Sequence, residues 1–237
     1  MHYLDLTLPS PAANLACDEA LLDACEENSS PEVLRFWEPQ EFFVVAGISN
    51  AVGREANLEA CRRAGVGVFR RCSGGGTVLQ GPGCLNYSLT LKIAGRPDLE
   101  TIPGANRYIM ARQCEAVSAV LGCAAEVRGC TDLAIGARKF SGNAQRRKRR
   151  ALTFHGTFLL AFDFALMENF LTMPSREPEY RHGRSHADFL MNLDVPARAI
   201  KAALREAWSA TEGLGDVPDC RRLVAEKYSR DEWNLKF

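Results

Sequence analysis

The sequence predicts one principal domain in which helices and β-strands are mixed. Its 237 residues suit one large domain better than two small ones, and 46% of them are hydrophobic, which is ordinary for a globular protein with a sizeable core. β-rich runs alternate with helical spacings, and no repeat, low-complexity linker or domain boundary separates them. We therefore expect residues 1–237 to form a single domain.

The charge and cysteine content narrow the class of protein. Lysine plus arginine and aspartate plus glutamate both number 29, so no global field attracts nucleic acid, and an electrostatic partner must be met by a local patch. Nine cysteines are an odd number without CxxC spacing, which favours reduced thiols. No signal peptide and no run of about 18 apolar residues is found. We expect a cytoplasmic protein that binds neither nucleic acid nor membrane.

The N-terminal elements are a helix and two strands. Residues 12–27 suit a helix because Ser10 can cap it and Pro11 suits its first turn. Residues 33–37 and 42–46 are β-rich runs with a Pro-containing turn between them, so we expect two strands joined by that turn.

The next elements lead into a glycine-rich turn. Residues 54–64 favour a helix closed by Gly65, and residues 66–71 favour a strand whose exit meets three consecutive glycines. Residues 85–93 alternate as a strand should, and residues 106–121 have helical spacing.

The second half of the chain begins with hairpins. Residues 132–136 and 138–145 suggest a tight hairpin with glycine at its turn, and a second hairpin joins that strand to residues 151–160. The remainder favours helices, at 163–171, near 196–210 and in a last segment that ends near Tyr228.

The stretch Arg70 to Val78, with the sequence RRCSGGGTV, is the most informative feature of the chain. Bare glycine amides can approach a phosphate or carboxylate that a Cβ would hold away, and the arginines supply matching charge. It matches neither the Gly-Lys-Ser/Thr phosphate loop nor the dinucleotide pattern of three spaced glycines. The stretch is therefore a plain turn or an anion cradle of another kind.

Lys139 is the strongest candidate for chemistry outside that loop. It lies in a predicted strand near Gly142, which permits close approach of a ligand. It is either an outward-facing strand residue or a fixed ammonium that stabilises negative charge at an acyl centre.

Two further residues have competing interpretations. His155 is a half-buried strand histidine or part of the same cleft, and the scattered histidines lack the spacing of a metal site, so we expect no metal held by side chains. Cys130 is a small core residue or a covalent nucleophile, since it is the thiol closest in sequence to the Lys139 strand.

The basic run 146–150 forms the tip of the second hairpin. It is either a solvated turn or a docking patch for an acidic protein. RNA binding lacks the interleaved aromatic residues it would need.

Five motifs together resemble the lipoate–protein ligase family, in order and at suitable spacing. They are Arg70–Val78, Leu85–Ser88, Asp132–Leu133, Lys139–Gln145 and His155–Thr157, with Glu232–Asn234 near the end. The resemblance covers nearly the whole chain. Biotin ligases, which share the fold, are a poorer match because their arginine-rich loop differs.

The resemblance implies an α+β fold built on a mixed, largely antiparallel sheet, and an enzyme that attaches lipoic or octanoic acid to a lysine. By similarity, Lys139 would contact both the phosphate and the acyl carbonyl of an acyl-adenylate. Asn86 and Asp132 would help to position it. The remaining residues implied to surround it are Gly47, Arg70, Ser73, Gly74, Gly75, Gly76, Thr77, Gly142, Asn143, Ala144 and His155.

The same resemblance implies the ligands and partners. ATP would activate the acid, with Mg²⁺ held largely by phosphates. An octanoyl tail in an apolar tunnel would gain about 0.8 kcal/mol per methylene. The acceptor would be an acidic lipoyl domain protein, such as an E2 subunit or a glycine cleavage H protein.

Two departures from the family bear on the activity. Family members often carry histidine where this chain has Gln80. Ligases that activate free acid often have an accessory C-terminal domain, which we expect to be absent here, or a separate accessory subunit. The first hypothesis is acyl transfer through an acyl-adenylate. The others are octanoyl transfer from a carrier protein through a Cys130 thioester, and non-catalytic binding of an acyl or adenylate ligand beside a second subunit.

Overall fold

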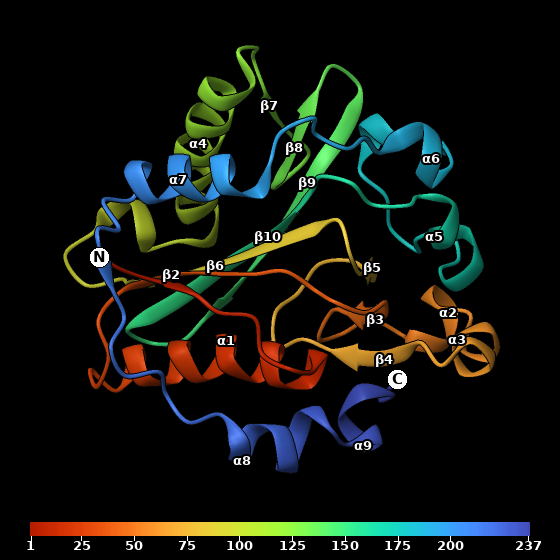
Figure 1. Ribbon diagram of the computed structural model, residues 1–237, viewed down its shortest axis with the longest axis horizontal. Helices are drawn as coiled ribbons and strands as arrows, with labels where there is room; N and C mark the ends of the chain where they lie inside the picture. Colours follow the sequence, from red (N-terminus) through yellow and green to blue (C-terminus); the bar gives the residue numbers. More distant parts are fainter.

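The computed structural model describes residues 1–237 as two sheets surrounded by helices (Figure 1). The larger sheet contains, in spatial order, β11 (Glu212–Gly213), β1 (His2–Asp5), β2 (Val33–Trp37), β6 (Cys84–Lys92), β10 (Ala151–Leu159), β9 (Arg138–Arg147), β8 (Asp132–Ile135) and β7 (Glu126–Arg128). The smaller sheet contains β4 (Gly67–Arg70), β3 (Phe43–Ala46) and β5 (Val78–Gln80). Only β1 with its two neighbours and β3 with β4 pair in parallel, which confirms the predicted mixed, largely antiparallel α+β fold.

The helices lie on both faces of the larger sheet. In Figure 1, α4 and α7 lie on one side of it, whereas α1 and the C-terminal helices lie on the other. The α-helices are α1 (Pro11–Glu26), α2 (Val52–Glu55), α3 (Leu58–Ala64), α4 (Ile102–Leu121), α5 (Ala165–Phe170), α6 (His186–Phe189), α7 (Ala197–Ala207), α8 (Arg221–Leu223) and α9 (Asp231–Asn234). Short 3₁₀ turns span Pro97–Leu99 and Glu179–Arg181, and a π-helical turn spans Val224–Tyr228.

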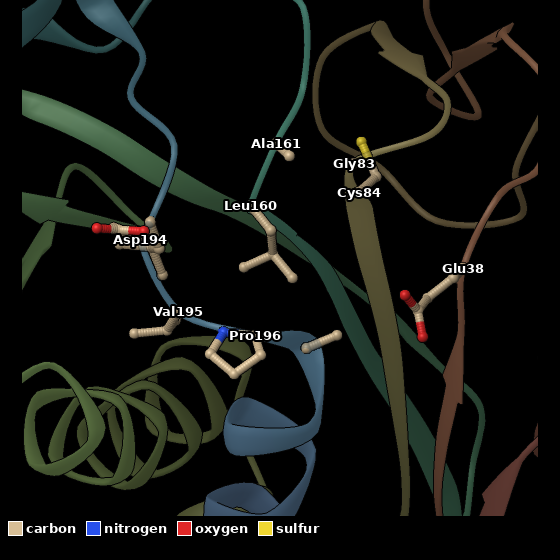
Figure 2. Close-up of a pocket in the computed structure, with 10 residues that line it drawn as sticks. Glu38, Gly83, Cys84, Leu160, Ala161, Asp194, Val195 and Pro196 are labelled. Carbon is tan, nitrogen blue, oxygen red and sulfur yellow. The ribbon is translucent and has the colours of Figure 1, made fainter.

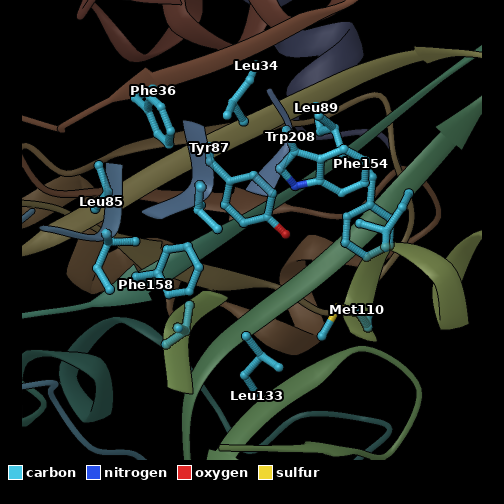
Figure 3. Close-up of a cluster of buried hydrophobic side chains, with 14 of the residues drawn as sticks. Leu34, Phe36, Leu85, Tyr87, Leu89, Met110, Leu133, Phe154, Phe158 and Trp208 are labelled. Carbon is cyan, nitrogen blue, oxygen red and sulfur yellow. The ribbon is translucent and has the colours of Figure 1, made fainter. Parts of the chain in front are cut away.

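The main hydrophobic core fills the space between the larger sheet and the α4 and α7 helices. Alternate residues of β6 and β10, including Tyr87, Leu89 and Phe154, point to this side and are fully buried with Met110 of α4 (Figure 3). Burying a large apolar side chain stabilises the fold by roughly 1.5–3 kcal/mol. The strands therefore present their other residues, among them Asn86 and Ser88, to the opposite face.

That opposite face is polar, and α1 packs on it. Ser10 caps the helix by accepting a hydrogen bond from Ala13 N, and Pro11 occupies the first turn, as predicted. The fully buried Arg35 guanidinium of β2 donates to Asp18 Oδ1 of α1 at 2.7 Å, and Ser88 Oγ donates to the same oxygen at 2.6 Å. Most buried residues of α1 are apolar, and Asn14 and Asp18 among them join the helix to the polar residues of this sheet face.

The structure corrects two element predictions. The strands β2 and β3 belong to different sheets, so the turn between them is a crossing from one sheet to the other. The helix predicted at 54–64 is two helices, because Asn57 begins a new one by accepting a hydrogen bond from Ala60 N. Gly65 ends the second helix at a φ of 67°, as expected. The short strands β1, β5 and β11 had no prediction.

The helices and the cysteines were also compared with the expectations from the sequence. None of the helices is both long enough and apolar enough to span a bilayer. All nine cysteines are free thiols.

The buried Arg35 and Asp18 pair yields a stability prediction. Asp18→Ala leaves a fully buried guanidinium without its ionic partner, so urea denaturation should show a loss of about 3–5 kcal/mol in the free energy of unfolding. Asp219→Ala removes an exposed pair with Arg221 and is the control, with no measurable change expected. Equal effects of the two substitutions would contradict this account.

Candidate active site

The polar face of the larger sheet contains a single row of residues that crosses five strands. The strand registers pair Trp37 with Asn86, Asn86 with Thr157, Thr157 with Gly142, and Gly142 with Asp132. Directly opposed residues in such a row lie roughly 5 Å apart. The row brings together three residues that the sequence analysis singled out from distant segments.

A β-bulge places Lys139 over this row. Leu133 pairs with Ser141 and Ala134 with Lys139, so Phe140 is an extra residue in β9 that redirects the lysine. The Lys139 ammonium lies 2.7 Å from Asp132 Oδ1. A Cβ on Gly142 would come within 2.8 Å of Lys139 Nζ, so glycine is needed for the lysine to lie across the strand. Lys139 and Asp132 therefore form a fixed ion pair on the polar face.

Tyr180, which the sequence analysis missed, holds the other oxygen of that carboxylate. Its hydroxyl donates to Asp132 Oδ2 at 2.9 Å, and its ring packs against Phe189 with the centroids 5.1 Å apart. Burial, together with the nearby Asp132 charge, raises the pKa of Tyr180, so the phenol stays a donor at neutral pH. No motif in the sequence distinguishes this tyrosine, because the contact depends on how the loop before α6 folds back.

The glycine-rich loop is shaped from within by Arg71. The Arg71 guanidinium donates to Gly74 O, to Gly76 O at 2.8 Å and to Ser73 Oγ at 3.2 Å. Burial lowers the pKa of Arg71 to about 10, which leaves it charged at neutral pH. The amide N–H groups of Gly74, Gly75 and Gly76 donate to no acceptor in the protein. Arg71 thus holds two loop carbonyls toward the protein interior, and the three glycine amides remain free to donate to a ligand.

Glu55 fixes the C-terminal end of the loop at Thr77, and the sequence did not predict this role. It accepts hydrogen bonds from Thr77 Oγ1 at 2.6 Å, from Asn50 Nδ2 at 2.5 Å and from Ser175 Oγ at 2.5 Å. Burial alone would raise the pKa of Glu55, but these hydrogen bonds outweigh it and lower the pKa, so the group remains a carboxylate. Gly47 packs directly against Gly75 O, where a side chain would clash, and so forms the expected wall of the loop.

His155 lies beneath the loop on the next row of the sheet. Its Nε2 is 2.5 Å from Ser73 Oγ, and it pairs in register with Ala144. Burial, with a smaller effect of Arg71, lowers the pKa of His155 to about 4, so the neutral ring accepts the serine proton. A Cβ on Gly75 would lie 3.5 Å from Ala144 Cβ, which places the loop tip over β9 two residues from Gly142.

The side chains of three residues that were expected to bind the ligand make hydrogen bonds within the protein. Arg70 is fully buried, and its guanidinium donates only to backbone carbonyls, including Gly47 O at 2.7 Å, Asn50 O and Trp233 O, so it does not face the loop cavity. Asn143 points to the opposite face, where Tyr87 Oη donates to its Oδ1 at 2.6 Å. The Thr77 hydroxyl is committed to Glu55. Successive side chains of a strand point to opposite faces, so the sequence alone could have shown that Asn143 does not share a face with Gly142 and Ala144.

Cys130 is exposed in the turn between β7 and β8, two residues before Asp132. It is therefore not the small core residue that one interpretation of the sequence favoured. Its place near the lysine strand keeps the covalent interpretation open.

An open pocket of about 430 Å³ lies elsewhere on the sheet (Figure 2). Glu38, Cys84, Leu160 and Pro196 are among the residues that line it, and neither Lys139 nor the glycine loop does. The acyl tunnel expected from the sequence stays a prediction. No group of three or more His, Cys, Asp or Glu side chains is arranged to hold a metal ion.

Comparisons with known proteins show which family the chain resembles. A family model described as the lipoyl protein ligase A/B catalytic domain matches residues 10–204. The chain is 29% identical to octanoyltransferase LipM of Geobacillus kaustophilus, over 99% of this chain and 98% of that protein.

Two solved structures share the fold. One is a bipartite lipoate protein ligase and its E2 lipoyl domain from Thermoplasma acidophilum, with 22% identity, a TM-score of 0.82 and coverage of 99% of this chain and 95% of that one. The other is a lipoate-protein ligase A bound with ATP, with 24% identity, a TM-score of 0.79 and coverage of 99% of both chains.

The lowered pKa of His155 yields a prediction for stability against pH. Between about pH 6.5 and 4 the unfolded chain binds a proton on this residue and the folded chain does not, so the stability that the neutral ring contributes is lost as the pH falls through that window. His155→Gln removes the titrating group, so its free energy of unfolding should fall less steeply there than that of the parent. The free energy of unfolding is measured at several pH values for both proteins, and parallel dependences on pH would contradict this assignment. The pKa of His186 is also lowered by burial, but this residue is present in both proteins and contributes equally to both dependences.

Proposed function

The chain belongs to the lipoyl protein ligase A/B catalytic domain family, and from this premise we propose that it transfers a lipoyl or octanoyl group from an acyl-adenylate to a lysine of a lipoyl acceptor domain. One observation carries the proposal: a fixed ammonium and a loop with three unpaired amide donors lie on the same face of one strand. Gly75 at the loop tip lies next to Ala144, because a Cβ added to this glycine would come within 3.5 Å of Ala144 Cβ, and Lys139 lies over Gly142, about 7 Å further along that strand.

The two groups suit the two ends of a mixed anhydride. Amide N–H groups and an ammonium bind phosphate oxygens, and the ammonium can also stabilise the negative charge that develops on an acyl carbonyl. The acceptor lysine arrives as a neutral amine, forms a bond to the carbonyl carbon and expels AMP, while its proton passes to solvent. The work of the site is positioning and charge stabilisation.

Formation of the adenylate from free acid needs ATP. The carboxylate of lipoate or octanoate attacks the α-phosphorus and releases pyrophosphate. Mg²⁺ supplies charge neutralisation at the phosphates in such reactions, and it would be held mainly by them, because Asp132 already accepts from Lys139 and Tyr180. A neighbour in fold is described as bipartite, so we propose that a separate subunit assists this first step.

A specific observation favours a second candidate. Cys130 is exposed beside the Asp132 end of the row, and a full-length relative is named an octanoyltransferase. In that reaction the Cys130 sulfur takes the acyl group from a carrier thioester, and the Cys130 thiol proton passes to the released carrier thiol. The acceptor amine then takes the acyl group, and its proton passes to the Cys130 sulfur, which is freed as a thiol.

For the acceptor, we propose docking at the basic tip of the β9–β10 hairpin. Lys148 pairs with Asp23 at 2.6 Å and Arg147 donates to Leu99 O, whereas Arg146, Arg149 and Arg150 are exposed and make no ion pair. Three free cations lie at the end of β9 opposite to Lys139, roughly 25 Å along the strand from it, where they would favour encounter with an acidic domain that reaches from the hairpin to the site.

The donor experiment separates the two reactions. A lipoyl-domain acceptor is incubated with octanoate plus ATP and Mg²⁺, with octanoyl-adenylate, or with octanoyl carrier protein, and its intact mass is measured. We expect transfer from octanoyl-adenylate, a loss on the order of 100-fold or more in Lys139→Ala, and no loss in Cys130→Ser. Arg198→Ala, on the exposed side of α7, is the charge-matched control.

Three results would change this conclusion. Lack of transfer from octanoyl-adenylate would contradict the proposed reaction. Transfer from the carrier protein alone, abolished in Cys130→Ser, would establish the thioester route. Binding of acyl-adenylate without transfer from any donor would leave a binding protein.

The docking proposal predicts a change in acceptor affinity alone. Replacing Arg146, Arg149 and Arg150 by glutamate should raise the KM for the acceptor about tenfold at low salt, with kcat unchanged and the difference shrinking as salt rises. Arg62→Glu with Arg63→Glu reverses an exposed basic pair on α3 and serves as the control. An unchanged KM in the hairpin variant would refute docking at this tip.

A further inference from the structure

Three side chains form a closed hydrogen-bonded ring at the floor of the candidate site. Gln80 Nε2 donates to Thr157 Oγ1 at 2.7 Å, Thr157 Oγ1 donates to Asn86 Oδ1 at 2.5 Å, and Asn86 Nδ2 donates to Gln80 Oε1 at 3.0 Å. Each member donates once and accepts once. Hydrogen bonds that run in one direction around a ring reinforce one another.

The ring fixes the orientation of two buried amides. Gln80 and Asn86 are 6% and 5% exposed. Each NH₂ group has two hydrogens, and the ring uses one of each. No other acceptor within the protein receives the second hydrogen of Asn86 or of Gln80. The Asn86 amide is therefore held in one orientation with one donor in reserve.

The ring also joins the two halves of the site. Gln80 ends β5 of the smaller sheet, the strand that follows the glycine loop, whereas Asn86 and Thr157 lie on the larger sheet. Thr157 is paired with Gly142, over which the Lys139 ammonium lies. The ring is thus a polar connection between the loop strand and the lysine row.

We infer that Gln80 is a positioning residue for acyl transfer. Acting with Thr157, it orients the Asn86 amide so that the free N–H faces the acyl carbonyl on the side next to Lys139, and it sets the separation between the glycine loop and that lysine. The inference rests on the proposed function. Neither member of the amide pair titrates, so this donor is present at every pH at which the protein is folded.

The test is a double-substitution cycle with a matched control. Gln80→Met and Thr157→Val each open the ring without a large change in shape. Thr153→Val changes the same residue type on the same face of the same strand, but the buried Thr153 hydroxyl has no hydrogen-bond partner, so this control should behave as the parent. Rates are measured with octanoyl-adenylate and a lipoyl-domain acceptor.

Opening the ring should lower kcat about tenfold in either single variant, with the KM for octanoyl-adenylate within about twofold of the parent. Because both substitutions break one ring, the double variant should lose no more than about 30-fold, whereas independent effects would multiply to about 100-fold. Thr157→Ser keeps the hydroxyl and should restore kcat to within about threefold.

Multiplicative losses, or a lower melting temperature with kcat unchanged, would overturn the inference. NMR of the Asn86 side-chain amide tests the inference without turnover and so separates it from the proposed function. These signals should shift and exchange faster with solvent in Thr157→Val and Gln80→Met. They should keep their positions in Thr157→Ser and Thr153→Val. If the parent transfers no acyl group from any donor, the proposed function fails. Unmoved Asn86 signals in Thr157→Val would overturn the ring itself.

Discussion

The ion pair between Lys139 and Asp132, lying across Gly142, is the constraint on which the rest of the candidate site depends. It exists because a bulge at Phe140 turns the lysine onto the polar face and because Gly142 has no Cβ to occupy the space. Tyr180 then holds the second carboxylate oxygen, so the charge cannot swing away from its position. The ammonium keeps further donors for a ligand, since Asp132 engages only one of its three.

Two adjacent arginines show how buried charge shapes the glycine loop and its wall. Arg71 draws the glycine loop carbonyls inward, and Arg70 fastens the wall at Gly47 to the C-terminal segment at Trp233. Both are strongly buried, so losing any one acceptor would leave a guanidinium poorly compensated. The same logic applies to Glu55, a buried carboxylate whose hydrogen-bond donors come from three separate segments.

Local signals predicted much of the fold, and the motifs predicted the strand and loop that form the site. The hairpins around Gly136 and at 146–150, the α1 cap and the glycine turn at a strand exit all follow from short-range rules, and the structure contains each of them. The assignment of β2 and β3 to different sheets could not be predicted, because a turn of four residues is compatible with either pairing. That Arg71 and not Arg70 binds the glycine loop could not be predicted for a similar reason: neighbours at a strand end point to opposite sides, and only the tertiary structure decides which side the loop lies on. Tyr180 and Glu55 act across long separations in sequence, so no local pattern marks them.

A crystal structure with octanoyl-sulfamoyl adenosine, a non-reactive analogue of the acyl-adenylate, tests the central claim most directly. The account predicts that Lys139 Nζ lies within hydrogen-bond distance of the group that replaces the phosphate or of the acyl carbonyl, with amides of Gly74 to Gly76 on the same ligand. A ligand seated in the pocket beside Glu38 and Leu160, or one that leaves Lys139 without a contact, would contradict it.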